Sequence, residues 1–279
     1  LVTGLHGEVF DHKVILSTIP FTLIGLPLAI FLGFRNTASY DRFWEARKRW
    51  GDVLLHARNL ARQCTSLMDL PQPAFYSLGF SDVRVRMVYR CIAFAHALKH
   101  QLRGTDEADQ VARWLTPEEH AGLVGQRARH VALMQGMGAD LLLARRAGWI
   151  DPMASTVVDG SICELMAAAT ACERIKNTPL PFSYSLLLHR TAYLYCFLLP
   201  FGLVDAIGYM TPVVVGIVAY TFFGLDALGD EIEEPFGLLD NDLPLDAICQ
   251  TLEVNLRQAL GEPAETLPAP LQPVDYCLM

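Results

Sequence analysis

The residues best suited to catalysis or metal binding do not form a complete motif in this sequence. His96 and His100 are one helical turn apart, as in a two-histidine zinc site, but Ala97 occupies the place where that chemistry needs glutamate. Gly136 and Gly138 lack the preceding strand of a dinucleotide-binding loop, and the sequence contains no Ser-His-Asp or G-x-S-x-G pattern. We therefore expect no enzymatic activity, no cofactor and no bound metal.

An acidic run near the C-terminal end could attract cations. Asp240 and Asp242 are the expected cation-attracting pair, because carboxylates at the mouth of a pore concentrate positive ions. The same composition is typical of a solvated helix end, which is the alternative. The whole run comprises Asp230, Glu231, Glu233, Glu234, Asp240 and Asp242.

The most informative pattern lies in an apolar segment near the start of the chain. Leu26, Ile30 and Phe34 recur every fourth residue and form one apolar stripe on a helix. In an oligomer this stripe could face a central axis and form three stacked apolar rings. The alternative is an ordinary surface that faces lipid or the protein core. Pro27 favours a special role, because a proline leaves a carbonyl without its usual helical partner.

A second stripe on the same helix consists of the small residues Gly25, Ala29 and Gly33. Small residues let helices approach closely, so we expect this stripe to contact the neighbouring subunit. Leucine at Gly25 or Gly33 should then disrupt assembly more than Leu28→Ala.

The amino-acid composition indicates the class of protein in which these patterns lie. The chain has 279 residues, of which 52% are hydrophobic and only 19% are charged, and this balance favours a membrane protein over a soluble domain. The formal net charge of -8 argues against nucleic-acid binding, which needs clustered lysine and arginine.

Three segments are apolar enough to cross a membrane: residues 14–34, 191–204 with a backward extension to 183, and 206–225. The last two are close enough to form a hairpin with a tight turn between Asp205 and Thr211. Basic residues crowd the C-terminal side of the first segment, so that side is expected to be cytoplasmic. A further span is expected upstream of Leu1, because it would return the N-terminus to the cytoplasm.

The remaining sequence predicts helices with few strand signals. Thr116 and Asp151 precede prolines as helix N-caps, and residues 244–260 form another amphipathic helix. The proline-rich residues 261–279 are expected to be extended. We therefore predict an all-α fold.

We expect four regions along the chain. They are an extracellular segment with the pore-lining span (1–34), a cytoplasmic helical domain (35–182), a transmembrane hairpin (183–228), and a cytoplasmic C-terminal helix with its tail (229–279).

Three stretches resemble the bestrophin family, in particular its bacterial branch. The longest is IPFTLIGLPLAIFLGFRNTASYDRFWEARKRWG at 19–51. It is supported by PLPFSY at 179–184 with HRT at 189–191, and by EPFG at 234–237 with NDLPLD at 241–246.

The resemblance implies a homo-pentameric ion channel in the bacterial inner membrane, with most of the chain cytoplasmic. Its hydrophobic neck would correspond to Leu26, Ile30 and Phe34, and its cytoplasmic aperture to Met153. Asp240 and Asp242, separated by Asn241, are what remains of the calcium clasp that animal members carry.

Bacterial members resemble channels for monovalent cations, so sodium is expected to pass in preference to chloride. A membrane-anchored scaffold or sensor that binds a cytoplasmic partner is the alternative. A secondary transporter is a third possibility, but the inverted repeats and midplane polar sites of that class are not evident.

Overall fold

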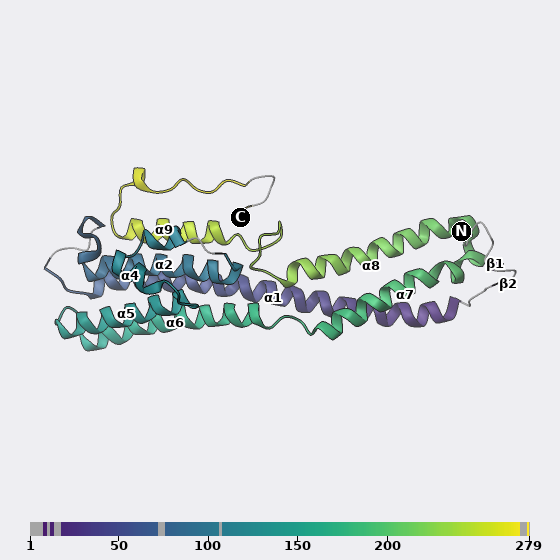
Figure 1. The fold of residues 1–279 in the computed structure, drawn as a ribbon, viewed down its shortest axis with the longest axis horizontal. Coiled ribbons are helices and arrows are strands. Elements are labelled where there is room, and N and C mark those ends of the chain that lie inside the picture. The colour runs from purple at the N-terminus through teal and green to yellow at the C-terminus, as the bar shows by residue number, and fades with distance from the viewer. Residues whose placement is uncertain are drawn as a thin grey trace. The chain divides into compact units, whose positions relative to one another are not determined.

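A computed structural model describes residues 8–9, 12–13, 18–71, 76–105, 108–273 and 278. The chain divides into two compact units. The hairpin unit comprises Leu1–Phe43 and Pro179–Glu234, and the helical unit comprises Trp44–Thr178 and Pro235–Met279. Figure 1 shows the elements of both units.

The predicted all-α class is confirmed for the described residues, apart from one antiparallel pair of two-residue strands. The hairpin unit contains β1 (Glu8–Val9), β2 (His12–Lys13), the first part of α1 (Thr18–Leu67), α7 (Phe182–Ile207), η2 (Gly208–Met210) and α8 (Thr211–Glu233). The helical unit contains the rest of α1, η1 (Tyr76–Ser81), α2 (Val83–Arg103), α3 (Ala108–Ala112), α4 (Pro117–Leu123), α5 (Arg129–Arg146), α6 (Pro152–Asn177), α9 (Leu245–Ala259) and η3 (Ala264–Thr266).

Helix α1 is a continuous helix of 50 residues that includes Pro27. Its described part begins at Thr18, so residues 14–17 of the expected first span lie outside the described residues. Charged side chains appear from Arg35 onward without ending the helix.

Helices α7 and α8 form the predicted hairpin (Figure 1). Helix α7 ends at Ile207, and the short helix η2 leads directly into α8 at Thr211. Gly208 has a φ of 51°, which is a backbone conformation that glycine adopts without steric cost. The turn therefore falls within the interval expected from the sequence.

The hairpin unit has a small apolar core in which α1 packs on α7. Leu28 and Leu32 from α1 meet Leu188 and Ala192 from α7, and all four are buried. Aromatic side chains surround them: Tyr184, Tyr195, Phe222 and Phe223. This face of α1 is therefore used within the chain.

Gly25 has a different neighbour from the one expected. A Cβ atom at Gly25 would lie 2.9 Å from the Tyr195 hydroxyl of the same chain. Gly25 therefore makes room for α7, which corrects its assignment to a subunit contact. Around Gly33 a Cβ atom would meet nothing within 4 Å, so the prediction for that residue stands untested.

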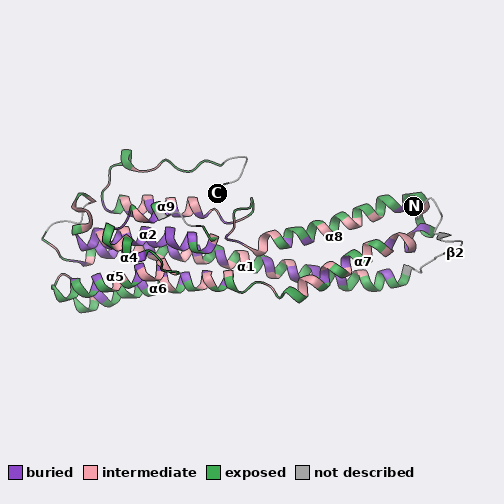
Figure 2. Cartoon of the chain, viewed as in Figure 1, coloured by how far each residue is buried: buried purple, intermediate pink, exposed green. Residues whose placement is uncertain are grey.

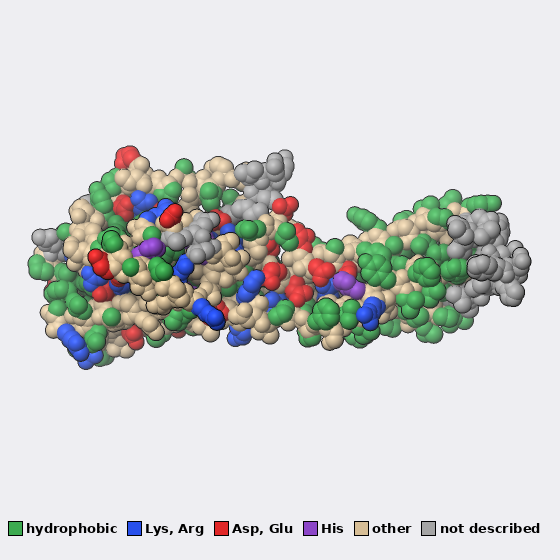
Figure 3. Space-filling view, viewed as in Figure 1, with side chains coloured by type: hydrophobic (Ala, Val, Ile, Leu, Met, Phe, Trp, Pro, Cys, Tyr) green, Lys and Arg blue, Asp and Glu red, His purple; other side chains and the backbone are tan. Residues whose placement is uncertain are grey.

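The hairpin unit leaves most of its apolar side chains exposed (Figures 2 and 3). In the most apolar windows of α1 and of the α7–α8 segment, only 22% and 17% of the residues are buried inside the chain. The core helices of soluble proteins are mostly buried, whereas a membrane-spanning helix exposes apolar side chains to lipid or to other subunits.

The helical unit is built around α2, which contacts α5, α6 and α9. Most residues of α2 are buried, as Figure 2 shows. The predicted caps are confirmed: Thr116 forms a capping box with Glu119, and the Asp151 carboxylate accepts hydrogen bonds from the Met153 and Ala154 amides.

An ion-pair network joins α2 to α5. The buried Asp140 carboxylate accepts hydrogen bonds of 2.7–2.8 Å from Arg86 and one of 2.7 Å from Arg90. Burial by itself raises the pKa of Asp140, but these hydrogen bonds and the two positive charges outweigh it, so the pKa is lowered.

Replacing Asp140 by asparagine should lower the free energy of unfolding at pH 7 by about 3 kcal/mol, because the partly buried Arg86 loses its carboxylate partner and the buried Arg90 keeps only Glu119. Since the pKa of Asp140 is lower in the folded state, its stabilisation is complete above the unfolded pKa of about 4 and is lost as pH falls through the folded pKa. Thermal unfolding of parent and variant at pH 7 and pH 3 tests this. The same difference in stability between parent and variant at pH 7 and at pH 3 would contradict the prediction.

Candidate functional site

The predicted neck residues form an exposed stripe on α1. The exposed fractions of Leu26, Ile30 and Phe34 are 64%, 47% and 64%. Leu28 and Leu32, in contrast, are only 4% and 2% exposed. At about 100° per residue, the centres of the exposed and buried stripes lie about 180° apart around α1. The three apolar side chains therefore point away from the core of their own chain.

Met153 is also exposed on the surface of the chain. It follows the N-cap Asp151 and Pro152 at the start of α6, and it is 78% exposed. The Met153 side chain therefore makes few contacts within its own chain.

The face of α6 that carries Met153 also carries one carboxylate, that of Glu164, whereas Asp159 lies about 120° from Met153 around the helix axis. Asp159 and Glu164 are exposed, whereas Val158, Ile162 and Leu165 are buried. Glu164 follows Met153 by three helical turns, which places it about 16 Å along the axis and only about 20° around it. Arg174 and Lys176, the basic residues of α6, lie in its last turn.

The two expected cation-attracting residues lie in the same loop but have different environments. Asp240 is exposed in the loop after α8. Asp242 stabilises that loop: its Oδ2 accepts a hydrogen bond of 2.7 Å from the Leu239 amide, and its own amide donates to the Leu239 carbonyl. The Asp242 carboxylate therefore has a local structural role, and any attraction of cations stays a prediction.

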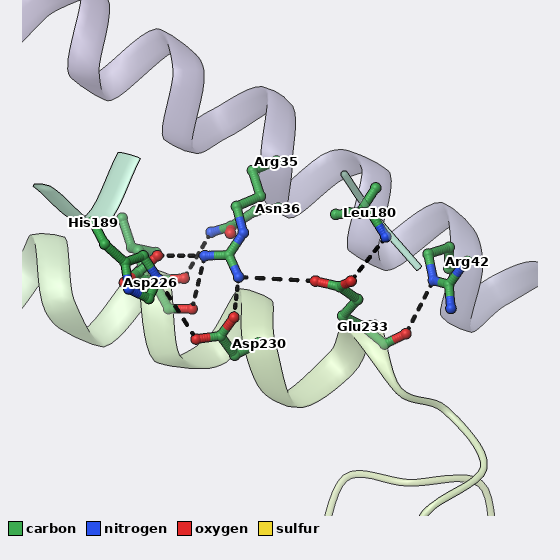
Figure 4. Close-up of polar contacts among 9 residues, drawn as sticks. Arg35, Asn36, Arg42, Leu180, His189, Asp226, Asp230 and Glu233 are labelled. Carbon is green, nitrogen blue, oxygen red and sulfur yellow. Dashed lines mark hydrogen bonds and ion pairs between the residues drawn. The ribbon is translucent and has the colours of Figure 1, made fainter. Parts of the chain in front are cut away.

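A charged cluster, called here the Arg35 cluster, lies immediately after the neck stripe (Figure 4). It consists of Arg35, His189, Asp226, Asp230 and Glu233. The Arg35 side chain is fully buried, and its guanidinium donates to Asp226 and Asp230 of α8. A buried guanidinium needs such partners, because an unpaired charge in an apolar environment is very costly.

Two more contacts extend the Arg35 cluster along α1 and α8. Asn36 donates to the Leu225 carbonyl at 3.0 Å, and Arg42 donates to the Glu233 carbonyl at 3.0 Å. The Glu233 carboxylate accepts a hydrogen bond of 3.0 Å from the Leu180 amide. The cluster therefore holds the end of α8 against α1 and the start of the hairpin.

Several members of the Arg35 cluster were identified from the sequence, but they were not paired. Arg35 is the first of the basic residues that follow the first span, and His189 begins the HRT stretch of the family resemblance, while Asp230 and Glu233 belong to the acidic run. Asp226 was missed because the expected third span ended one residue earlier. The pairing could have been predicted from two features: an arginine at the end of one apolar span and a carboxylate at the end of another.

The two histidines of α2 contact different partners. His100 interacts with the Thr105 hydroxyl at 2.8 Å and the Gln110 side-chain oxygen at 3.2 Å. His96 lies 3.7 Å from the Glu253 carboxylate of α9.

Long helices with exposed apolar faces and a paired charged cluster are typical of an integral, helical membrane protein. A model of the family described as Bacterial/Fungal Bestrophin protein matches residues 1–258. The chain belongs to this bestrophin family.

Curated relatives match most of the chain. The Voltage-dependent anion channel-forming protein RSc3414 of Ralstonia nicotianae is 45% identical over 94% of this chain and 83% of its own length. The Voltage-dependent anion channel-forming protein YneE of Escherichia coli K12 is 40% identical over 89% of this chain and 80% of its own length. These names give no support to the expected preference for cations.

Solved structures share the fold. A bacterial bestrophin homologue from Klebsiella pneumoniae, crystallised as a point mutant, is 41% identical, with a TM-score of 0.83. The match covers 89% of this chain and 90% of that one.

Proposed function

We propose that this chain is a subunit of a homo-pentameric ion channel in the bacterial inner membrane, with the helical unit in the cytoplasm. The observation that carries the proposal is the Leu26, Ile30 and Phe34 stripe, which is apolar, exposed and opposite the buried face of α1. Around a five-fold axis the stripe forms three apolar rings. Family membership and the names of the relatives support an ion channel over a scaffold.

The rings act as a neck that resists ion passage when it is dry. Leucine, isoleucine and phenylalanine side chains offer no oxygen to replace an ion's hydration shell, so water tends to leave a narrow apolar constriction. Ions then cross only when the neck hydrates. Met153 forms a second constriction at the cytoplasmic aperture.

We assign the channel a preference for monovalent cations, sodium among them, over chloride. The support is the exposed carboxylate of Glu164, which lies on the same face of α6 as Met153. Carboxylates that line an ion pathway attract cations and repel anions.

The reversal potential of the purified protein in planar bilayers with asymmetric NaCl tests this function. Its sign distinguishes cation from anion permeation, and native mass spectrometry gives the number of subunits. A reversal potential near the equilibrium potential of chloride would reject the cation preference but would still support an ion channel. An assembly that conducts no ions would favour the scaffold.

Replacing Glu164 by arginine should lower the ratio of sodium to chloride permeability several-fold, with a smaller decrease for Glu164→Gln. A positive side chain at this position repels sodium from the lumen that Met153 faces. Glu118→Arg, which changes an exposed carboxylate on α4, is the matched control and should leave the ratio unchanged. Equal ratios in the parent and Glu164→Arg would exclude Glu164 from the pathway.

A further inference from the structure

We propose that His189, Asp226 and Asp230 form a binding site for a divalent transition-metal ion of the zinc type. The sequence alone predicted no metal. The three residues come from α7 and α8, and one ligand atom from each lies within 4.8 Å of the others. Imidazole nitrogen with carboxylate oxygen is a usual ligand set for zinc.

The distances between the donor atoms suit a tetrahedral ion. His189 Nε2 lies 2.9 Å from Asp226 Oδ2 and 3.9 Å from Asp230 Oδ2. Zinc bonds of about 2.0–2.1 Å in tetrahedral geometry place neighbouring ligand atoms about 3.3–3.4 Å apart. The two distances from His189 lie on either side of that value, each within about 0.6 Å of it, and the two aspartate oxygens lie within 4.8 Å of each other. Water would complete the coordination, since His189 and Asp230 are partly exposed.

His189 directs its Nε2 atom toward the two carboxylates. Its Nε2 is shielded from solvent and forms no hydrogen bond within the described residues, despite its proximity to Asp226. A neutral imidazole directs the lone pair of one ring nitrogen toward its acceptor or metal. The Nε2 atom is thus placed to coordinate an ion between the two carboxylates.

Arg35 organises the site without occupying it. The guanidinium binds the Oδ1 atoms of Asp226 and Asp230, whereas the Oδ2 atoms face His189 (Figure 4). Carboxylates that ligate zinc are commonly held by such hydrogen bonds from a neighbouring side chain. With Glu233, three carboxylates surround one buried arginine, so the local charge remains negative.

The ligand set also distinguishes among metals. Calcium takes six to eight oxygen ligands, and magnesium usually keeps several waters around one or two carboxylates. A site with one nitrogen and two single carboxylate oxygens therefore selects zinc or cobalt over both ions. Metal binding would join α7 to α8 directly after the neck.

Zinc titration of the chelator-treated, full-length protein in detergent tests the site. We expect calorimetric binding of one ion per subunit and a rise in the thermal unfolding midpoint. Calcium and magnesium at the same concentrations should cause no rise. His189→Gln and Asp230→Asn should each weaken zinc binding at least tenfold, whereas the control Asp240→Asn should retain it.

Cobalt provides a readout that does not depend on stability. Tetrahedral Co²⁺ should give the parent protein strong visible absorption bands, and these should disappear in His189→Gln that elutes as an intact oligomer. Absence of zinc binding in the parent, or undiminished binding in both site variants, would overturn the proposal. Ion conduction is measured separately, so either result leaves the proposed channel function intact.

Discussion

Replacing Leu26, Ile30 and Phe34 together by alanine is expected to raise the single-channel conductance several-fold. The change removes apolar bulk from three levels of the proposed neck in every subunit. A wider constriction holds a continuous column of water, so ions no longer have to shed their hydration shells. Because the side chains are uncharged, the ratio of cation to anion permeability should change less than the conductance. Planar-bilayer recording measures both quantities.

A matched stripe on α8 provides the control for this experiment. Val213, Ile217 and Tyr220 also share one exposed face, and their alanine variant should conduct like the parent. An alanine triple mutant of α1 that forms the same oligomer as the parent but conducts no better would place the constriction elsewhere. Met153 would be the next residue to replace.

Replacing Arg35 by methionine should destabilise the protein by about 3–5 kcal/mol, the usual cost of removing one partner from a buried ion pair. Methionine preserves the length and apolar stem of the side chain but removes the guanidinium that Asp226 and Asp230 share. The thermal midpoint in detergent should fall markedly. Arg35→Lys should recover little of the loss, because one ammonium group does not reproduce the forked geometry of a guanidinium.

Two further variants show whether the pairing causes the loss. Arg145→Met removes an exposed arginine of α5 and should leave the midpoint unchanged. Adding Asp226→Asn to Arg35→Met should recover part of the stability, because it removes an uncompensated carboxylate. An unchanged midpoint in Arg35→Met would show that the Arg35 cluster does not stabilise the fold.

Features set by neighbouring residues were predictable from the sequence alone. The apolar stretches of α1, α7 and α8, the turn at Gly208 and the caps at Thr116 and Asp151 all depend on residues a few positions apart. A helical period also made the Leu26, Ile30 and Phe34 stripe visible. Whether that stripe is exposed or buried was left open, because periodicity defines a face but not what covers it.

Tertiary structure decided which of these faces and charges meet. Gly25 and Tyr195 are far apart in sequence, so the role of the small stripe depended on how α7 packs on α1. The partners Asp226 and Asp230 lie 191 and 195 residues from Arg35. In the sequence, an arginine beside a span can be a cytoplasmic residue that sets the orientation of the span, or a buried residue. Only a buried arginine requires carboxylate partners. The sequence by itself determined the helices and their apolar stripes, and only folding assembled the Arg35 cluster, since electrostatic pairing depends on distance in space and not along the chain.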